Sequence, residues 1–250
     1  MGIELRNPPV NFGQASVSAP EGTRALDLNT TLIALSLAAI ASAILTVVAR
    51  YAPPQSSWQF YILKPLTTCL ILAAAVVPAA HAWSTYGTAI VLGLVLSLAG
   101  DVWLMLPGDR FVPGLASFFL GLLSYCVAFA AGRPLIAFPW PALPLLSIGA
   151  LVLWYLWPTL PFKLRFPVSV YVLAMVAMAS LAGYRALSHP PAGALSAAIG
   201  GVLFLASDAL LAINRFRRPF RSAHAFVLGT YFVGQLLISL SVGLLAGASA

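Results

Sequence analysis

Long apolar runs alternate with short polar connections along this chain. Most of these runs reach the ~18 residues that an α-helix needs to cross the hydrocarbon core of a bilayer. Apolar and polar residues do not alternate with a period of two, which argues against the strands of a membrane barrel. The pattern predicts eight transmembrane helices, at 31–49, 61–79, 87–106, 112–130, 141–157, 168–187, 194–213 and 222–245.

Composition supports the same class. The chain has 250 residues, of which 61% are hydrophobic and 8% are charged, whereas a soluble domain carries about 25% charged residues. The sequence therefore predicts an all-α fold, a polytopic transmembrane bundle of eight helices. We expect a single transmembrane domain at 31–250, preceded by a polar, loosely ordered N-terminal tail at 1–30.

Basic residues are unevenly placed around the predicted spans. Nine of the 13 lysines and arginines lie on one side, and short loops rich in Lys and Arg usually face the cytoplasm. We therefore expect both termini on the non-cytoplasmic side of an integral membrane protein, in a bacterial inner membrane. No basic run is long enough for a nucleic-acid backbone, so the net charge of +7 indicates contact with anionic membrane lipids. The nine residues are Arg50, Lys64, Arg110, Lys163, Arg165, Arg215, Arg217, Arg218 and Arg221.

Motifs for common nucleophiles, metals and cofactors are missing from the sequence. There is no G-x-S-x-G, H-E-x-x-H, phosphate-binding loop or dinucleotide fingerprint. Cys69 and Cys126 both fall inside predicted spans, which argues against a structural disulfide and gives no metal spacing. We expect neither a metal nor a cofactor, so any chemistry depends on carboxylates, lysine, tyrosine and amide groups.

One hairpin pattern occurs twice. Asp101 is followed by Arg-Phe at 110–111, and Asp208 is followed by Arg-Phe at 215–216. A tyrosine inside the next span follows at Tyr125 in the first copy and at Tyr231 in the second. An even number of spans separates the copies, which predicts two four-helix repeats related by a pseudo-twofold axis along the membrane normal.

The two aspartates of this pattern are the strongest candidates for function. Asp101 and Asp208 each lie about five residues from the same end of their spans, roughly 7–8 Å inside the apolar layer. A charged residue at the centre of a membrane helix costs about 2.5–3.5 kcal/mol, so such residues usually have a task. We interpret both as catalytic, one as a protonated acid and the other as a carboxylate. Alternatively, each pairs with Lys64 or Arg215 and only holds helices together.

Other polar residues lie near the same level of the bundle and form the candidate substrate-binding set. Lys64 also has the position of a lysine that extends its amine to the lipid headgroups. Asp109, by contrast, is interpreted as an ordinary loop residue. The set comprises Lys64, Tyr125, Asn214, Arg215, His224, Tyr231 and Gln235.

Five segments together resemble one family. They are LKPLTT at 63–68, GDVWLML at 100–106, RFVPGLASFFLGLLSY at 110–125, SDALLAINRF at 207–216 and TYFVGQLLI at 230–238. This set is similar to the lysoplasmalogenase (YhhN-like) family of eight-span membrane proteins. The resemblance implies hydrolysis of the vinyl ether bond of a lysophospholipid, with a fatty aldehyde and glycerophospho-ethanolamine or -choline as products.

The chemistry implied by the resemblance agrees with the residues. A vinyl ether opens when its carbon is protonated, which requires a general acid and a nearby anion or base, as two semi-buried aspartates provide. The chain departs from the family at one place, because members often have a histidine where this sequence has Leu122.

Two other function classes stay open from the residues alone. Paired intramembrane acids in direct repeats also suit a proton-coupled carrier of small solutes or lipids. A carrier requires a polar path across the bundle, and the sequence places few polar residues in the far halves of the spans that hold Asp101 and Asp208. The remaining class is a non-catalytic lipid-binding or scaffold protein in which the acids only join helices.

Overall fold

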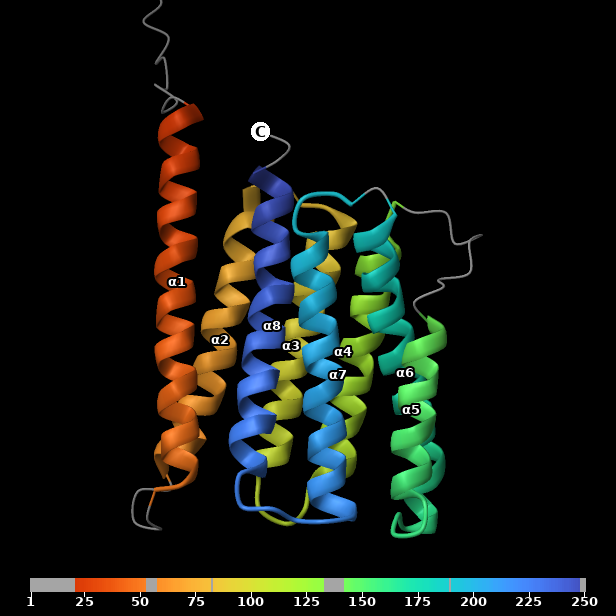
Figure 1. The fold of residues 1–250 in the computed structure, drawn as a ribbon. Coiled ribbons are helices and arrows are strands. Elements are labelled where there is room, and N and C mark those ends of the chain that lie inside the picture. Colours follow the sequence, from red (N-terminus) through yellow and green to blue (C-terminus); the bar gives the residue numbers. More distant parts are fainter. Residues whose placement is uncertain (1–20, 53–57, 82, 133–141, 189, 248–250) are drawn as a thin grey trace, which may run out of the picture.

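The computed structural model describes residues 21–52, 58–81, 83–132, 142–188 and 190–247, and within them every regular element is a helix (Figure 1). Each predicted span corresponds to one helix, which confirms the all-α bundle of eight helices. The helices are α1 (Glu21–Arg50), α2 (Trp58–His81), α3 (Thr85–Met105), α4 (Phe111–Ala130), α5 (Ala142–Leu156), α6 (Phe162–Leu187), α7 (Ala194–Phe216) and α8 (Ala223–Gly247).

Helix boundaries differ from the predicted spans at three places. Helix α1 begins at Glu21, so residues 21–30 are helical, while 1–20 of the expected tail lie outside the described residues. Helix α6 begins at Phe162 and includes Pro167 near its start, where a missing N–H costs little. Helix α5 has 15 described residues, about 22 Å, and is shorter than the seven helices long enough to cross a membrane.

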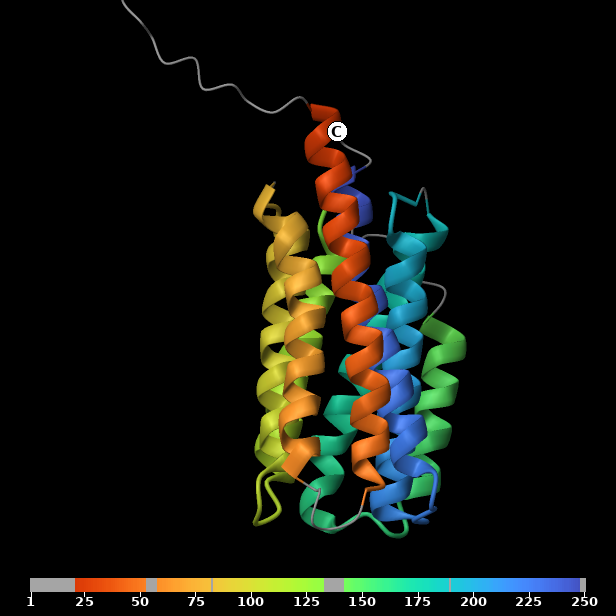
Figure 2. The same cartoon turned by 90° about the vertical axis from the view of Figure 1, so that its left-hand side faces the viewer.

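The long helices run side by side along one common direction (Figures 1 and 2). The start of α1 and the end of α8 lie at the same end of the bundle, and the α3–α4, α5–α6 and α7–α8 turns lie at the opposite end. That opposite end carries Arg110, Lys163, Arg215 and Arg217, and we call it the basic end. Among the described residues, the first and the last helical turns therefore lie at the end opposite to the basic end.

Helix packing follows the predicted repeat in the interior of the bundle. Helix α3 packs most extensively on α4, as α7 does on α8, and the α2–α3 and α2–α8 contacts match those of α6–α7 and α6–α4. The outer helices differ. Helix α1 packs on both α2 and α8, whereas among the described residues α5 packs on α6, touches α7 and makes no comparable contact with α4. The repeat itself stays a prediction.

Glycines allow the closest helix approaches. A Cβ atom added at Gly200 of α7 would lie 2.6 Å from the Gly234 carbonyl oxygen of α8, and one at Gly234 would lie 2.8 Å from the Gly200 oxygen. Small residues at such interfaces permit tight packing of membrane helices. On α3, a Cβ at Gly93 would lie 2.3 Å from the Tyr125 ring, so this ring rests directly on the α3 backbone.

Replacing Gly200 with leucine is expected to destabilise the bundle, because α7 and α8 must separate to make room. Overpacking of this kind typically costs about 1–3 kcal/mol, which should lower the melting temperature of the detergent-solubilised protein. Gly229→Leu is the matched control, since a Cβ at Gly229 of α8 meets no atom within 4 Å. Equal melting temperatures for the two variants would contradict the proposed role of Gly200.

Candidate active site

A polar cavity opens at the basic end of the bundle. Its volume is about 1350 Å³, including its open part, and α1, α2, α3, α4, α7 and α8 all contribute to its wall. Both aspartates singled out from the sequence, Asp101 and Asp208, line this cavity. Arg50, Lys64 and His224 line it as well, so its wall carries both acidic and basic groups.

Asp101 is buried and fully engaged. Its Oδ1 lies 2.9 Å from the Lys64 Nζ of α2, and its Oδ2 accepts hydrogen bonds from the Thr68 hydroxyl at 2.8 Å and the Tyr231 hydroxyl at 2.7 Å. The residue is 1% exposed. Because all three neighbours donate, the arrangement suits an ionised carboxylate. Asp101 therefore joins α2, α3 and α8, as expected for a residue that holds helices together.

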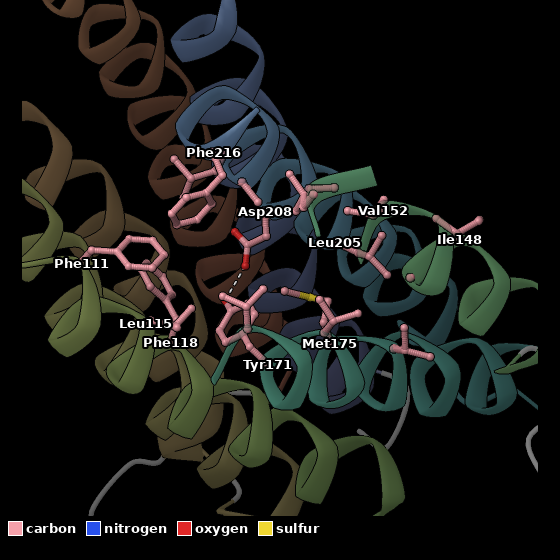
Figure 3. Close-up of a pocket in the computed structure, with 18 of the residues that line it drawn as sticks. Phe111, Leu115, Phe118, Ile148, Val152, Tyr171, Met175, Leu205, Asp208 and Phe216 are labelled. Carbon is pink, nitrogen blue, oxygen red and sulfur yellow. Dashed lines mark hydrogen bonds between the residues drawn. The ribbon is translucent and has the colours of Figure 1, made fainter. Parts of the chain in front are cut away.

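Asp208 has a different environment. Its Oδ2 accepts a hydrogen bond from the Tyr171 hydroxyl of α6 (Figure 3). The residue is half-buried. No lysine or arginine forms an ion pair with Asp208 among the described residues. A carboxyl group in this position is free to present its second oxygen to a ligand.

A second, apolar cavity of about 800 Å³, including its open part, meets the polar cavity at Asp208. It lies between α4, α5, α6 and α7, and Asp208 is the one charged residue among those that line it. In Figure 3, Asp208 and Tyr171 stand between Phe111 and Leu115 of α4 on one side and Val152 of α5 on the other. The residues shared by the two cavity walls are Leu104, Phe118, Asp208 and Leu211. Asp208 thus faces a polar space and an apolar space at once.

Two of the expected binding residues lie deeper in the bundle. The Tyr125 hydroxyl donates to the Gln235 Oε1 at 2.7 Å, and the Gln235 Nε2 donates to the Ser97 hydroxyl at 3.0 Å. Tyr125, Gln235 and Ser97 are fully buried and are absent from the walls of the two cavities that meet at Asp208. Their hydrogen bonds connect α3, α4 and α8 beneath the polar cavity.

Of the remaining expected residues, Tyr231 and His224 lie at the polar cavity. Tyr231 contacts Asp101 directly, and the His224 Nε2 lies 2.9 Å from the Arg50 Nη2 near the end of α1. Arg50 had no specific role in the sequence analysis. Its guanidinium group adds a cation to this wall of the cavity.

Asn214 and Arg215 lie away from the walls of both cavities. The Asn214 Oδ1 accepts a hydrogen bond from the Phe220 N–H at 3.2 Å within the α7–α8 turn. The Arg215 Nη2 lies 2.7 and 2.9 Å from the two carboxylate oxygens of Asp109, and its guanidinium group stacks 4.2 Å from the Phe111 ring centroid. Asp109 is therefore the ion-pair partner of Arg215, and this pair joins the α3–α4 and α7–α8 hairpins.

Tyr171 is a site residue that the sequence analysis missed, as are Thr68 and Arg50. It follows Lys64 by the same 107 residues that separate the two aspartates. Lys64 contacts Asp101 and Tyr171 contacts Asp208, so the two side chains occupy matching places in the two halves of the bundle. The position 107 residues after Lys64 is Tyr171, so extending the predicted repeat from the aspartates to their neighbours would have identified this residue.

The described residues hold no group of three or more His, Cys, Asp or Glu side chains placed to bind a metal ion. Cys69 and Cys126 are both free thiols. The site as described consists of two carboxylates, hydroxyl groups and cations.

This fold and site define a class of protein, the polytopic helical membrane protein with a carboxylate-lined cavity inside the bundle. The chain belongs to the YhhN family, because the model of the YhhN family matches residues 59–242. That match includes every expected site residue from Lys64 to Gln235, and it confirms the resemblance found in the sequence.

Several curated proteins are similar over much of the chain. The chain is 36% identical over 203 residues to an uncharacterized membrane protein YhhN of Escherichia coli O6:H1, covering 81% of this chain and 95% of that protein. It is 39% identical over 154 residues to human lysoplasmalogenase TMEM86B, covering 59% and 60%. It is 32% identical over 209 residues to a lysoplasmalogenase of Mycobacterium bovis, covering 78% and 76%. No solved structure matches the chain.

Proposed function

We propose that this protein is a membrane-embedded hydrolase that cleaves the vinyl ether bond of lysoplasmalogens. The observation that carries the proposal is the position of Asp208, an aspartate without an ion-pair partner among the described residues, where a polar and an apolar cavity meet. The reacting bond of a lysoplasmalogen likewise joins a polar headgroup to a hydrocarbon chain. Relatives named lysoplasmalogenase support the same activity.

The two aspartates divide the chemistry between them. Protonated Asp208 gives its proton to the carbon of the double bond farther from the ether oxygen, which leaves an oxocarbenium ion on the neighbouring carbon. The Asp208 carboxylate then takes a proton from the water that attacks this ion. The resulting hemiacetal collapses to a fatty aldehyde and the free hydroxyl of the glycerophospholipid. One water is consumed, and Asp208 ends the cycle protonated.

Asp101 stays ionised throughout this cycle. Its charge stabilises the developing cation from the cavity wall and orients Lys64 and Tyr231, both of which it contacts. Asp208 is therefore the proton donor, and Asp101 is the fixed carboxylate of the site.

The cations of the polar cavity suit a phosphate-containing headgroup. Lys64 keeps N–H donors beyond its contact with Asp101, and Arg50 lies on the same wall. Arg215 was expected in this role, but its guanidinium group is engaged with Asp109. We also propose that the protein lies in a bacterial inner membrane with its basic end facing the cytoplasm. In this orientation the substrate enters from the cytoplasmic leaflet.

Leu122 does not contradict the proposed activity. This residue stands where family members often have a histidine, and it is fully buried in the apolar core. It is absent from the walls of the polar and apolar cavities. We infer that Asp208 transfers the proton in this chain without help from a residue at position 122.

The packing below the polar cavity favours a hydrolase over a carrier. Phe118 contacts Phe204 and Tyr231 edge to face, and Phe204 contacts Tyr125 in the same way. Tyr125 and Phe204 are fully buried. These rings and the buried, hydrogen-bonded Gln235 and Ser97 fill the interior where a carrier would need an open path toward the far end of the bundle.

A direct assay tests the proposed function. The purified protein in detergent, incubated with a lysoplasmalogen, is expected to release fatty aldehyde, measured by mass spectrometry of a trapped hydrazone. The matched 1-O-alkyl lysophospholipid, which lacks only the double bond, should release none, because no carbon is available to protonate. Absence of aldehyde from the vinyl ether substrate would reject the hydrolase proposal, and proton-driven uptake of the intact lipid by proteoliposomes would support the carrier instead.

A further inference from the structure

The apolar cavity lies where the two halves of the bundle differ. Helix α1 packs on α8 in one half, but α5 makes no comparable contact with α4 among the described residues of the other half. The cavity lies against this gap, with Phe111 and Leu115 of α4 and Ile148 and Val152 of α5 on its two sides (Figure 3). A groove of this kind connects the interior with the surrounding lipid.

The lining identifies what the apolar cavity can hold. Aliphatic and aromatic side chains make up nearly all of its wall, and the carboxyl group of Asp208 and the hydroxyl group of Tyr171 lie together at its junction with the polar cavity. Its empty volume of about 800 Å³ includes the part that is open at the surface. The cavity therefore suits a hydrocarbon chain whose polar end reaches Asp208.

We propose that the apolar cavity is the binding site for the alkenyl chain, and that the chain enters laterally between α4 and α5. The inference rests on the proposed function and extends it, because it assigns the substrate's two parts to two cavities. The headgroup lies by Arg50 and Lys64, the chain lies between α4, α5, α6 and α7, and the bond between them reaches Asp208.

Selection of the chain follows from the membrane setting. Transfer of a chain from lipid into an apolar cavity gains little from the hydrophobic effect, since lipid tails are already apolar. The shape of the wall then decides which chains bind. Ala212 lies on the wall one helical turn from Asp208, so a larger side chain there would occupy the space beside the reacting bond.

Photolabelling locates the chain without requiring hydrolysis. The probe is a 1-O-alkyl lysophospholipid with a diazirine at the end of its chain, bound to the wild-type protein in detergent and competed by the same lipid without diazirine. Competable label is expected on the cavity-facing segments of α5 and α6, at 148–152 and 172–176. Competable label confined to the apolar groove of α1, α2 and α8, which includes Ile40, Ile44 and Val233, would overturn the inference.

Variants test whether this wall selects the chain. Ala212→Phe is expected to reduce kcat/KM at least about tenfold, because the added ring fills the part of the cavity beside the reacting bond. Val202→Phe on the same helix is the control, since Val202 is 49% exposed and is absent from the cavity wall. No loss, or a loss no larger than that of Val202→Phe, would contradict the inference. Failure of the wild-type protein to release aldehyde from any chain would instead reject the hydrolase proposal, and the labelling pattern would still locate the chain.

Discussion

Asp208→Asn is expected to reduce kcat for aldehyde release by about 10²–10⁴-fold, the usual contribution of a general acid. Asparagine has nearly the same shape as aspartate, and its carbonyl oxygen can still accept the hydrogen bond from Tyr171. Its amide cannot give a proton to the double bond or take one from the attacking water. The loss should appear in single-turnover rates at saturating substrate, because the headgroup and chain sites are unchanged.

Two controls separate this loss of chemistry from a loss of fold. The melting temperature of Asp208→Asn should match that of the wild type, since the residue is half-buried and has no ion-pair partner among the described residues. Tyr171→Phe should lower kcat by about tenfold, because Asp208 stays present but loses the hydroxyl that orients it. Wild-type rates in a well-folded Asp208→Asn protein would remove Asp208 from the mechanism.

The sequence predicted the helices better than their ends. A run of apolar residues long enough to cross a bilayer has few alternatives to a helix, so each span was identified from length and composition. The start of α1 at Glu21 was missed because residues 21–30 are more polar and resemble a tail. The start of α6 was missed because Pro167 is typical of a boundary, although a membrane helix tolerates proline near its first turns.

The candidate site was predictable where charge was involved. An aspartate inside an apolar span is rare enough to stand out, and the repeated hairpin placed Asp101 and Asp208 at one level. Tyr171 did not stand out, because it lies outside the repeated hairpin that singled out Tyr125 and Tyr231. The Arg215–Asp109 pair depends on a turn in which Gly108 and Asp109 both adopt positive φ, at 88° and 49°, and such backbone detail is not visible in residue type alone.

In the proposed mechanism, the two aspartates differ in role because they have different neighbours, Lys64 beside Asp101 and Tyr171 beside Asp208. Lysine beside Asp101 supplies a positively charged ion-pair partner. Tyrosine beside Asp208 supplies a neutral hydroxyl group and permits a proton on the second oxygen. The two aspartates thus have different partners, and this difference is what the proposed acid–base mechanism requires.

Lys64→Met is expected to be the most destabilising change at the site. The Lys64 and Asp101 side chains are 10% and 2% exposed, so removing the ammonium group leaves a buried carboxylate without its counter-ion. Breaking a buried ion pair from one side typically costs about 3–5 kcal/mol. We therefore expect a marked drop in melting temperature in detergent, a reduced yield of monodisperse protein and loss of aldehyde release.

The double variant Lys64→Met/Asp101→Asn distinguishes loss of the ion pair from loss of packing. Its asparagine keeps an acceptor for Thr68 and Tyr231 and carries no charge, so most of the lost stability should return. A double-mutant cycle completed with Asp101→Asn should give a coupling energy above about 1 kcal/mol, because the two residues contact each other. Additive effects would show that Lys64 stabilises the bundle through its alkyl chain instead. Aldehyde release should stay low even in the stable double variant, because the fixed carboxylate and the phosphate-binding cation are both absent.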